Sequence, residues 1–443
     1  MHAAYLTDSS GFQGHADKLF APANEAEVSS ILTEAQRQNI PVTACGSRTG
    51  LTGGSVAQGG WVLSLEKFRQ LEIGRGSARA GAATTLLDLR DAAAPTRQFY
   101  APDPTEITAS VGGTIATNAS GSRSFRFGST RRHVNALRMA FIDGRIAEYR
   151  RGDKLDFPVS RVPLPNVTKC TAGYRLEPGM DWIDLICGSE GTLGIVLEAD
   201  LQLLPIPDNL FAGVAFFSAD EAALDAVDAW RGIPDLRMLE YVGLNALRLL
   251  RERFPEIPQD AAAALLIEAE DLDTWESRLP ETAWIAGTVK DRERIRRFRH
   301  SLPELVIEFI SKRGFLKMGT DYAVPLPRNR EMLAYYTARL EADLRDQYVI
   351  YGHIGDAHVH VNMLPSTPAQ RDTASALLKE FAAKAVELGG TVSAEHGLGK
   401  RKAGMLALQY APAHIEAMLE VKRRLDPRWL LGRGNLFPVP QGI

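Results

Sequence analysis

The feature of this sequence that most constrains its fold is a set of glycine-rich segments in the first half of the chain. "CGSRTGLTGG" (residues 45–54) places four glycines between positions 46 and 54, directly after the strand-like run "PVTAC". A loop with so few side chains lets several backbone N–H groups converge on a phosphate oxygen. It is not a Walker loop, because no Gly-Lys-Ser/Thr ends it, and it does not fit the GxGxxG dinucleotide pattern. Taken alone, such a loop is more often a turn than a ligand site, so both interpretations stay open.

Two further segments have the same character. "SVGGTIATNASGSRSFRFG" (residues 110–128) consists largely of small residues, and "GSEGTLG" (residues 188–194) is again rich in glycine. A backbone with so little side-chain bulk is suited to lie against a flat ligand rather than inside another core layer. Three such segments between residues 45 and 194 predict a long cofactor bound along one domain.

The length and the change of texture along the chain predict more than one domain. A chain of 443 residues is too long for one typical hydrophobic core, and two or three domains are expected. Beyond Pro207 the glycine loops give way to longer amphipathic helices, so the boundary is placed near residues 205–207. Strands and helices interleave in both halves, which indicates a mixed α/β or α+β protein.

The composition excludes several classes of partner. A net charge of -3 gives no electrostatic reason to expect nucleic acid or an anionic membrane surface. No apolar run approaches the roughly 20 residues that a membrane-spanning helix requires. Residues 1–20 have no basic start and no apolar core of the signal-peptide kind. The three cysteines, Cys45, Cys170 and Cys187, show no CxxC spacing, which fits a reducing compartment and predicts the cytoplasm.

Histidines concentrate in the second half. "YGHIGDAHVHVNML" (residues 351–364) holds three of the nine histidines of the chain. In a strand the side chains alternate, so His358, His360 and Asn362 are expected on one face. His353 lies beyond the bend at "GD", where strand parity cannot place it.

A second segment offers a carboxylate and another imidazole. "VSAEHGLGK" (residues 392–400) puts Glu395 and His396 side by side before a glycine loop. Two imidazoles with one carboxylate are a normal ligand set for zinc, manganese or iron. By position alone His358 and His360 form the ligand pair, with His353 as a third candidate. Hydrogen-bonded structural histidines and a Glu-His helix cap remain the alternative interpretation.

These motifs resemble those of a known flavoprotein family. "GSRTGLTGG", "PDPTEITASVGGTIATNASG" and "GSEGTLGIV", in this order, resemble the FAD-binding domain (PCMH type) of vanillyl-alcohol oxidase-type flavoproteins. "KMGTDYAVP", "YGHIGDAHVHVN" and "SAEHGLGK" resemble the C-terminal domain of the D-2-hydroxyacid dehydrogenase branch, which includes FAD-dependent D-lactate dehydrogenases, the glycolate oxidase flavoprotein subunit and D-2-hydroxyglutarate dehydrogenase.

The resemblance implies a two-domain α+β fold. Residues 1–206 would form the FAD-binding domain, and residues 207–424 would form a substrate or cap domain with an antiparallel sheet and helices. Residues 425–443 would return to the FAD-binding domain.

The same resemblance implies which residues contact FAD. The expected pyrophosphate loop comprises Gly46, Ser47, Arg48, Thr49, Gly50, Leu51, Gly53 and Gly54. The residues expected along the flavin and ribityl portions are Pro102, Asp103, Thr105, Gly112, Gly113, Thr114, Ala116, Thr117, Asn118, Ser120, Gly188, Glu190, Gly191, Gly194 and Ile195. Relatives that attach flavin covalently through this loop have a histidine at about the position of Thr49, so non-covalent FAD is expected. Near the C-terminus Gly432, Arg433 and Asn435 depart from the Asn-Pro-Gly-Lys of relatives, and Asn435 is kept as the expected FAD contact.

The family pattern also implies a metal site. The pattern His-x-Gly-Asp-Gly-Asn-x-His-x-Asn aligns with residues 353–362, where Ala357 replaces its second glycine and His358 replaces its first asparagine. By this carry-over the metal ligands are His353, His360 and Glu395, with zinc expected first and manganese or iron as alternatives.

Substrate-binding residues follow from the same resemblance. His396 is the expected general base, and Asn362 would lie near the substrate. Arg299 precedes Pro303-Glu304 as an arginine does in the family, and its guanidinium would bind a substrate carboxylate through two hydrogen bonds. Lys317 is a second candidate for this anion.

The implied activity is the oxidation of a small D-2-hydroxy acid, of the D-lactate, glycolate or D-2-hydroxyglutarate class, to the 2-oxo acid. The electron acceptor would be a quinone, an electron-transfer flavoprotein or a cytochrome. A peripheral location at the membrane and a homodimer are further expectations. Two alternatives are a non-catalytic flavin-binding subunit of a larger oxidase complex and a metal-dependent hydrolase without flavin.

Overall fold

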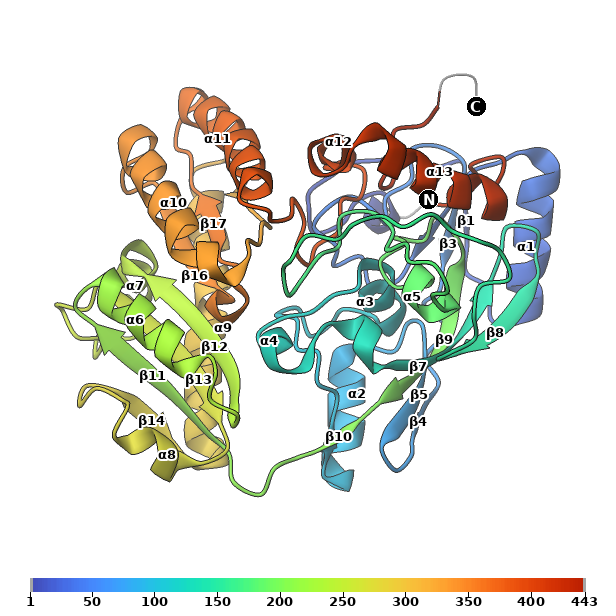
Figure 1. The fold of residues 1–443 in the computed structure, drawn as a ribbon. Coiled ribbons are helices and arrows are strands. Elements are labelled where there is room, and N and C mark those ends of the chain that lie inside the picture. Colours follow the sequence, from blue (N-terminus) through green and yellow to red (C-terminus); the bar gives the residue numbers. More distant parts are fainter. Residues whose placement is uncertain (1–2, 441–443) are drawn as a thin grey trace.

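The computed structural model describes residues 3–440, which form two units joined by an extended segment around β10 (Figure 1). β10 (Leu204–Pro205) pairs antiparallel with β6 (Gln98–Phe99) of the first unit, and the chain continues from there into the second unit. The chain is a two-domain protein with helices and mainly antiparallel sheets, which confirms the predicted α+β fold class.

Besides the β6–β10 pair, the described part of the first unit contains two sheets. The smaller one is parallel and runs β1-β3-β2, with bounds Lys18–Phe20, Trp61–Ser64 and Val42–Cys45. The larger one is antiparallel and runs β4-β5-β9-β7-β8, with bounds Leu71–Ile73, Ser77–Gly81, Ile195–Gln202, Val134–Ala140 and Ile146–Arg150. Its helices are α1 (Glu25–Gln38), α2 (Leu86–Ala93), α3 (Val111–Thr117), α4 (Ser124–Phe127) and α5 (Trp182–Ile186).

Helix α1 shows why these elements form where they do. The side chain of Asn24 accepts a hydrogen bond from the backbone N–H of Glu27 and so caps the first turn. Val28, Leu32 and Ala35 recur at helical spacing and are buried against the parallel sheet. Asn39, at φ 57°, ends the helix in the left-handed conformation.

The second unit is built on one seven-stranded antiparallel sheet. Its strand order is β14-β11-β13-β12-β16-β17-β15, with bounds Trp284–Ala286, Phe211–Phe217, Ala263–Ala269, Leu236–Gly243, Tyr348–Gly352, His360–Met363 and Met318–Gly319. Its helices are α6 (Asp220–Trp230), α7 (Leu244–Leu250), α8 (Leu272–Glu276), α9 (Val289–Ser311), α10 (Asn329–Asp343) and α11 (Pro368–Glu387).

Both faces of this sheet are covered, so its central strands are buried throughout. Leu247 of α7 and Phe298 of α9 pack with Val214 on one face. Leu224 of α6 packs with Leu265 on the other. A charged residue in such a strand therefore requires a partner, because an unpaired charge in this interior is costly.

The last helices, α12 (Leu406–Gln409) and α13 (Pro412–Leu425), lie on the first unit (Figure 1). Lys422 of α13 is buried and its ammonium group donates to the backbone carbonyls of Thr192 and Leu431. Lys422 thus contacts the first unit although it precedes residues 425–443, the segment that is predicted to return to that unit. None of the helices in residues 3–440 is both long and apolar enough to cross a bilayer.

Candidate functional site

A tight turn between β16 and β17 brings three histidines together. After Gly352 the chain makes a single 3-10 turn over Ile354–Asp356 and reverses at Ala357, whose φ is 50°. The backbone N–H of His358 then donates to the carbonyl of His353 at 3.2 Å, which closes the turn. The ring of His353 lies with its centroid 5.4 Å from that of His358 and 5.3 Å from that of His360, and the last two are 4.5 Å apart.

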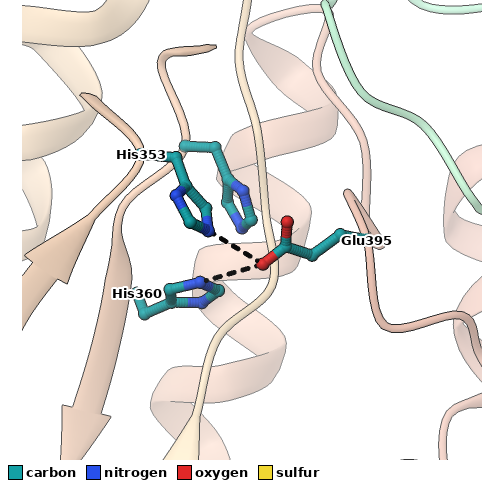
Figure 2. Close-up of side chains that lie close together, drawn as sticks. His353, His360 and Glu395 are labelled. Atoms are coloured by element: carbon teal, nitrogen blue, oxygen red, sulfur yellow. Dashed lines mark hydrogen bonds and ion pairs between the residues drawn. The ribbon is translucent and has the colours of Figure 1, made fainter. Parts of the chain in front are cut away.

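Glu395 completes this cluster from a distant segment. Its Oε1 lies 3.0 Å from Nε2 of His353 and 3.3 Å from Nε2 of His360, so one carboxylate oxygen faces two ring nitrogens (Figure 2). One donor atom from each of His353, His358, His360 and Glu395 lies within 4.8 Å of the others. The three residues expected to hold a metal are therefore together, and so is His358. Burial lowers the pKa of His358 to about 3, which keeps its imidazole neutral.

The second oxygen of Glu395 is held by the first unit. Oε2 accepts hydrogen bonds from Ser120 Oγ at 2.9 Å and Lys169 Nζ at 3.1 Å. Lys169 also lies 3.2 Å from Oδ2 of Asp356, and its side chain is only 1% exposed. Burial disfavours a charged carboxylate, but His353 and Lys169 hold the pKa of Glu395 well below its usual value. Ser120, expected beside flavin, thus contacts the metal-ligand candidate.

Glu240 positions His353 and Arg299 at once. Its Oε1 lies 2.5 Å from Nδ1 of His353, and its Oε2 accepts from Nε of Arg299 at 2.9 Å. Burial works against a charged His353, yet Glu240 and Glu395 outweigh it and raise its pKa to about 9. Arg299 therefore reaches the cluster, as expected, but it is already ion-paired there.

His396 lies at the open side of the cluster. Its backbone N–H donates to Asp321 Oδ2 at 3.0 Å, and its Nδ1 lies 3.6 Å from Asp321 Oδ1. The ring stacks on that of His360, with centroids 5.3 Å apart and planes within 9°. Burial lowers the pKa of His396 to about 4, although the Asp321 carboxylate opposes this shift. A neutral imidazole of this kind can accept a proton near neutral pH.

The remaining two substrate candidates lie together at the edge of the sheet. The ammonium group of Lys317 donates to Asn362 Oδ1 at 3.1 Å, and Nδ2 of Asn362 is buried without a partner among the described residues. Burial lowers the pKa of Lys317, and the positive charge of Lys402 lowers it further. No carboxylate of residues 3–440 lies within ion-pair distance of Lys317, which leaves it free for an anionic ligand.

The glycine loop after β2 lies beside a cavity of about 290 Å³, whose lining includes the expected FAD residues Gly46, Ser47 and Arg48. In the part of the chain that the structure describes, the backbone N–H groups of Thr49, Gly50 and Leu51 make no hydrogen bond. A Cβ added at Gly46 would come within 2.3 Å of Ser110 Oγ, so the backbone approaches α3 as only glycine permits. Unpaired amides next to a cavity fit the phosphate groups of a dinucleotide.

Two other expected FAD residues hold the two halves of the chain together. The carboxylate of Glu190 accepts the backbone N–H groups of Leu398 and Gly399, each at 2.7 Å. Asn435 Nδ2 donates to the carbonyls of Gly54 and Glu190 at 2.9 and 3.0 Å.

The rest of the expected FAD set lies nearby in the first unit. Asp103 is half-buried and accepts a hydrogen bond from Ser122 Oγ at 2.8 Å. The others belong to the segment of Pro102 and Thr105, to α3 with its C-cap Asn118, or to the loop that leads into β9. Their contacts with FAD stay predictions.

Sequence reasoning missed Lys169, Glu240 and Asp321. Glu240 carried a usable signal, because it is an acidic residue inside the apolar run "LRMLEYVG", where a buried charge demands a partner. Lys169 stands in the irregular segment between β8 and α5, and no local pattern distinguishes it from a surface lysine.

Comparisons with known proteins agree with this arrangement. A model of the FAD binding domain matches residues 16–150, and a model of the FAD linked oxidases, C-terminal domain, matches residues 207–436. The D-lactate dehydrogenase of Archaeoglobus fulgidus is 31% identical and the alignment covers 94% of this chain and 90% of that protein. Glycolate oxidase subunit GlcD of Bacillus subtilis is 31% identical, with coverage of 96% and 90%. D-2-hydroxyglutarate dehydrogenase of Xanthomonas citri pv. viticola is 30% identical, with coverage of 94% and 88%.

A solved structure shares the fold at low sequence identity. Alkyldihydroxyacetonephosphate synthase superposes with a TM-score of 0.68 at 14% identity, covering 94% of this chain and 76% of that one. Both halves of the chain thus match the two domains of one family, in the same order and over nearly the full length. The protein belongs to the FAD-linked oxidases and is an FAD-dependent oxidoreductase.

Proposed function

We propose that this protein oxidises a small D-2-hydroxy acid to the 2-oxo acid, with FAD as the hydride acceptor. The observation that carries the proposal is one buried cluster in which His353, His360 and Glu395 face one another beside the neutral imidazole of His396. The relatives are named as dehydrogenases or an oxidase subunit for D-lactate, glycolate and D-2-hydroxyglutarate, which supports this substrate class.

The cluster fits a divalent metal. Two ring nitrogens and a carboxylate oxygen converge, all three residues are largely shielded from solvent, and second partners fix His353 and Glu395 from behind. Such outer partners are typical of metal-binding imidazoles and carboxylates. When bound by His353, His360 and Glu395, a divalent ion supplies Lewis acidity that makes a substrate hydroxyl more acidic.

His396 is the group that takes the hydroxyl proton. The side chain of His396 is 24% exposed, a larger fraction than for the other clustered histidines. Its imidazole is neutral at pH 7. Asp321 fixes the backbone of His396, and the stacked ring of His360 fixes the plane of its imidazole. A positioned general base contributes about 100- to 10,000-fold to a proton-transfer step.

Three side chains are proposed to bind the substrate carboxylate. The Nε group of Arg299 donates to Glu240, so its terminal nitrogens are the groups that would bind the substrate carboxylate. One of them makes a weak contact of 3.4 Å with Thr105 Oγ1. Lys317 offers an ammonium group with no carboxylate partner in residues 3–440, and Asn362 orients it. Together they would fix the face of the acid that is presented to flavin.

Other features of the protein follow from the same proposal. FAD is bound non-covalently, since Thr49 lacks the imidazole nitrogen through which relatives form the covalent bond. The three cysteines are free, which supports a reducing compartment such as the cytoplasm. The electron acceptor is proposed to be a quinone, an electron-transfer flavoprotein or a cytochrome.

The test is anaerobic mixing of the purified yellow protein with D- and L-lactate, glycolate, and D- and L-2-hydroxyglutarate, followed by flavin absorbance. At least one D-acid or glycolate should bleach the flavin, and the L-acids should not. His396→Ala should keep FAD but slow bleaching by about 100-fold or more. His414→Ala, on α13, serves as the matched control and should react as the wild type does. No bleaching by any acid would refute the proposed reaction, and an unchanged rate in His396→Ala would refute the base.

A further inference from the structure

His358 is a fully buried imidazole with an unpaired ring nitrogen. Its exposed fraction is 0%, its Nδ1 has no hydrogen-bond partner within the described chain, and its Nε2 faces the carboxylate of Asp321. Leaving a polar group buried and unpaired is unfavourable, and such groups are rare in folded proteins. The chain therefore retains an expensive feature at the centre of its proposed metal site.

The position of His358 explains what this imidazole could bind. One of its donor atoms lies within 4.8 Å of the donor atoms of His353, His360 and Glu395. Its ring centroid is 4.5 Å from that of His360. Its Nε2 lies 3.3 Å from Asp321 Oδ1, so a carboxylate stands on one side of the ring. A carboxylate behind one nitrogen of an imidazole is a common arrangement when the imidazole is a metal ligand.

We propose that His358 is a fourth protein ligand, so that the site holds its ion through three imidazoles and one carboxylate. This inference rests on the metal site of the proposed function and adds a ligand to it. The family pattern has asparagine at this position, so the ligand would be a property of this chain.

The fourth ligand has a consequence for the choice of metal. Four protein donors saturate a tetrahedral zinc ion, whereas catalytic zinc keeps three protein ligands and one open position. A substrate can then coordinate only an ion that accepts five or six ligands. Imidazole ligands suit iron and nickel as well as zinc and copper, so the coordination number rather than the donor type separates these ions. The site is accordingly assigned to an ion of five- or six-coordinate preference such as Fe²⁺, rather than to tetrahedral zinc.

The experiment uses the full-length protein with FAD bound. Native metal is removed with a chelator, retention of FAD is verified by absorbance, and Co²⁺ is added as the probe. X-ray absorption then counts the imidazoles around Co²⁺, and competition with a chromophoric chelator gives the dissociation constant. The wild type should bind one Co²⁺ per chain through three imidazoles in a five- or six-coordinate site. Two imidazoles would overturn the fourth ligand without any variant having to fold. Three imidazoles around a four-coordinate ion would keep the fourth ligand and overturn the preference for a five- or six-coordinate ion.

Three variants locate the ligands. His358→Asn should bind Co²⁺ through two imidazoles, with affinity reduced by more than about 100-fold, beyond what loss of an outer partner causes. Unchanged affinity in His358→Asn, with binding lost in Glu395→Gln, would reject the fourth ligand and leave the three-ligand site intact. No Co²⁺ binding by the wild type would reject both. His396→Asn is the control and should bind Co²⁺ normally; a loss there instead would place the ion at the alternative group Asp321, His360 and His396.

Discussion

Among single residues, the buried charges around Glu395 decide whether the site can exist. Lys169 is enclosed by Glu395, Asp356 and the carbonyl of Gly121, at 3.1, 3.2 and 3.2 Å. The lysine neutralises two carboxylates that would otherwise repel each other in a site shielded from water. Its contribution to stability is therefore expected to be large, unlike that of an exposed lysine.

Replacing Lys169 by methionine should lower the free energy of unfolding by about 3–5 kcal/mol, since it leaves buried carboxylates without their cation. Urea unfolding of chelator-treated protein measures this. Lys154→Met, at an exposed position, should stay within about 0.5 kcal/mol of the wild type. Equal stability of the two variants would show that Lys169 does not neutralise the cluster.

Glu240 should matter for metal affinity although it is not a ligand candidate. Glu240→Gln weakens the bond to His353 Nδ1, which fixes the ring orientation, and should reduce Co²⁺ affinity by about 10- to 100-fold. Competition titration measures the change, with Glu256→Gln as the exposed acidic control. An unchanged affinity in Glu240→Gln would mean that the ring of His353 is held by the turn alone.

Motif reasoning found the ligand candidates because they stand in ordered, closely spaced patterns. It could not find Lys169 or Asp321 as partners, since their contacts join segments more than 70 residues apart in sequence. Such pairs arise only when the fold is assembled. It also could not foresee that Arg299 pairs with Glu240.

The hairpin of β16 and β17 is the element that gathers the histidines. Strand alternation predicted His358 and His360 on one face; one donor atom of each lies within 4.8 Å of the other, although His358 precedes β17. His353 depends on the reversal at Ala357, a left-handed residue that strand parity does not address. The turn conformation, rather than the strand, therefore sets the third member of the cluster.

Ala357→Val should lower the free energy of unfolding by about 2 kcal/mol or more, because a β-branched residue is strained at positive φ and overpacks a buried site. Ala357→Gly should stay within about 1 kcal/mol of the wild type. Glycine removes the backbone strain at positive φ, and this gain offsets the destabilisation from the lost methyl group and from the greater conformational freedom of the unfolded chain. Urea unfolding of both variants measures this. Equal loss in both would contradict the left-handed conformation at this turn.

For the complete chain, the presence of two domains was predictable from the glycine loops of the first half and the longer amphipathic helices of the second. The contacts of α12 and α13 with the first unit were not, because an amphipathic helix does not reveal which surface covers its apolar face. The proposed active site lies where the units meet. Ser120 and Lys169 come from the first unit and Glu395 comes from after α11, so catalysis requires both units in place.

The decisive measurement is the rate of flavin reduction by a reactive D-2-hydroxy acid before and after metal removal. Chelator-treated protein that keeps its FAD should reduce its flavin at least about 100-fold more slowly, since the Lewis acid contributes several kcal/mol. Stoichiometric divalent metal should restore the rate. Equal rates in metal-free and metal-loaded protein would contradict a metal role for His353, His360 and Glu395.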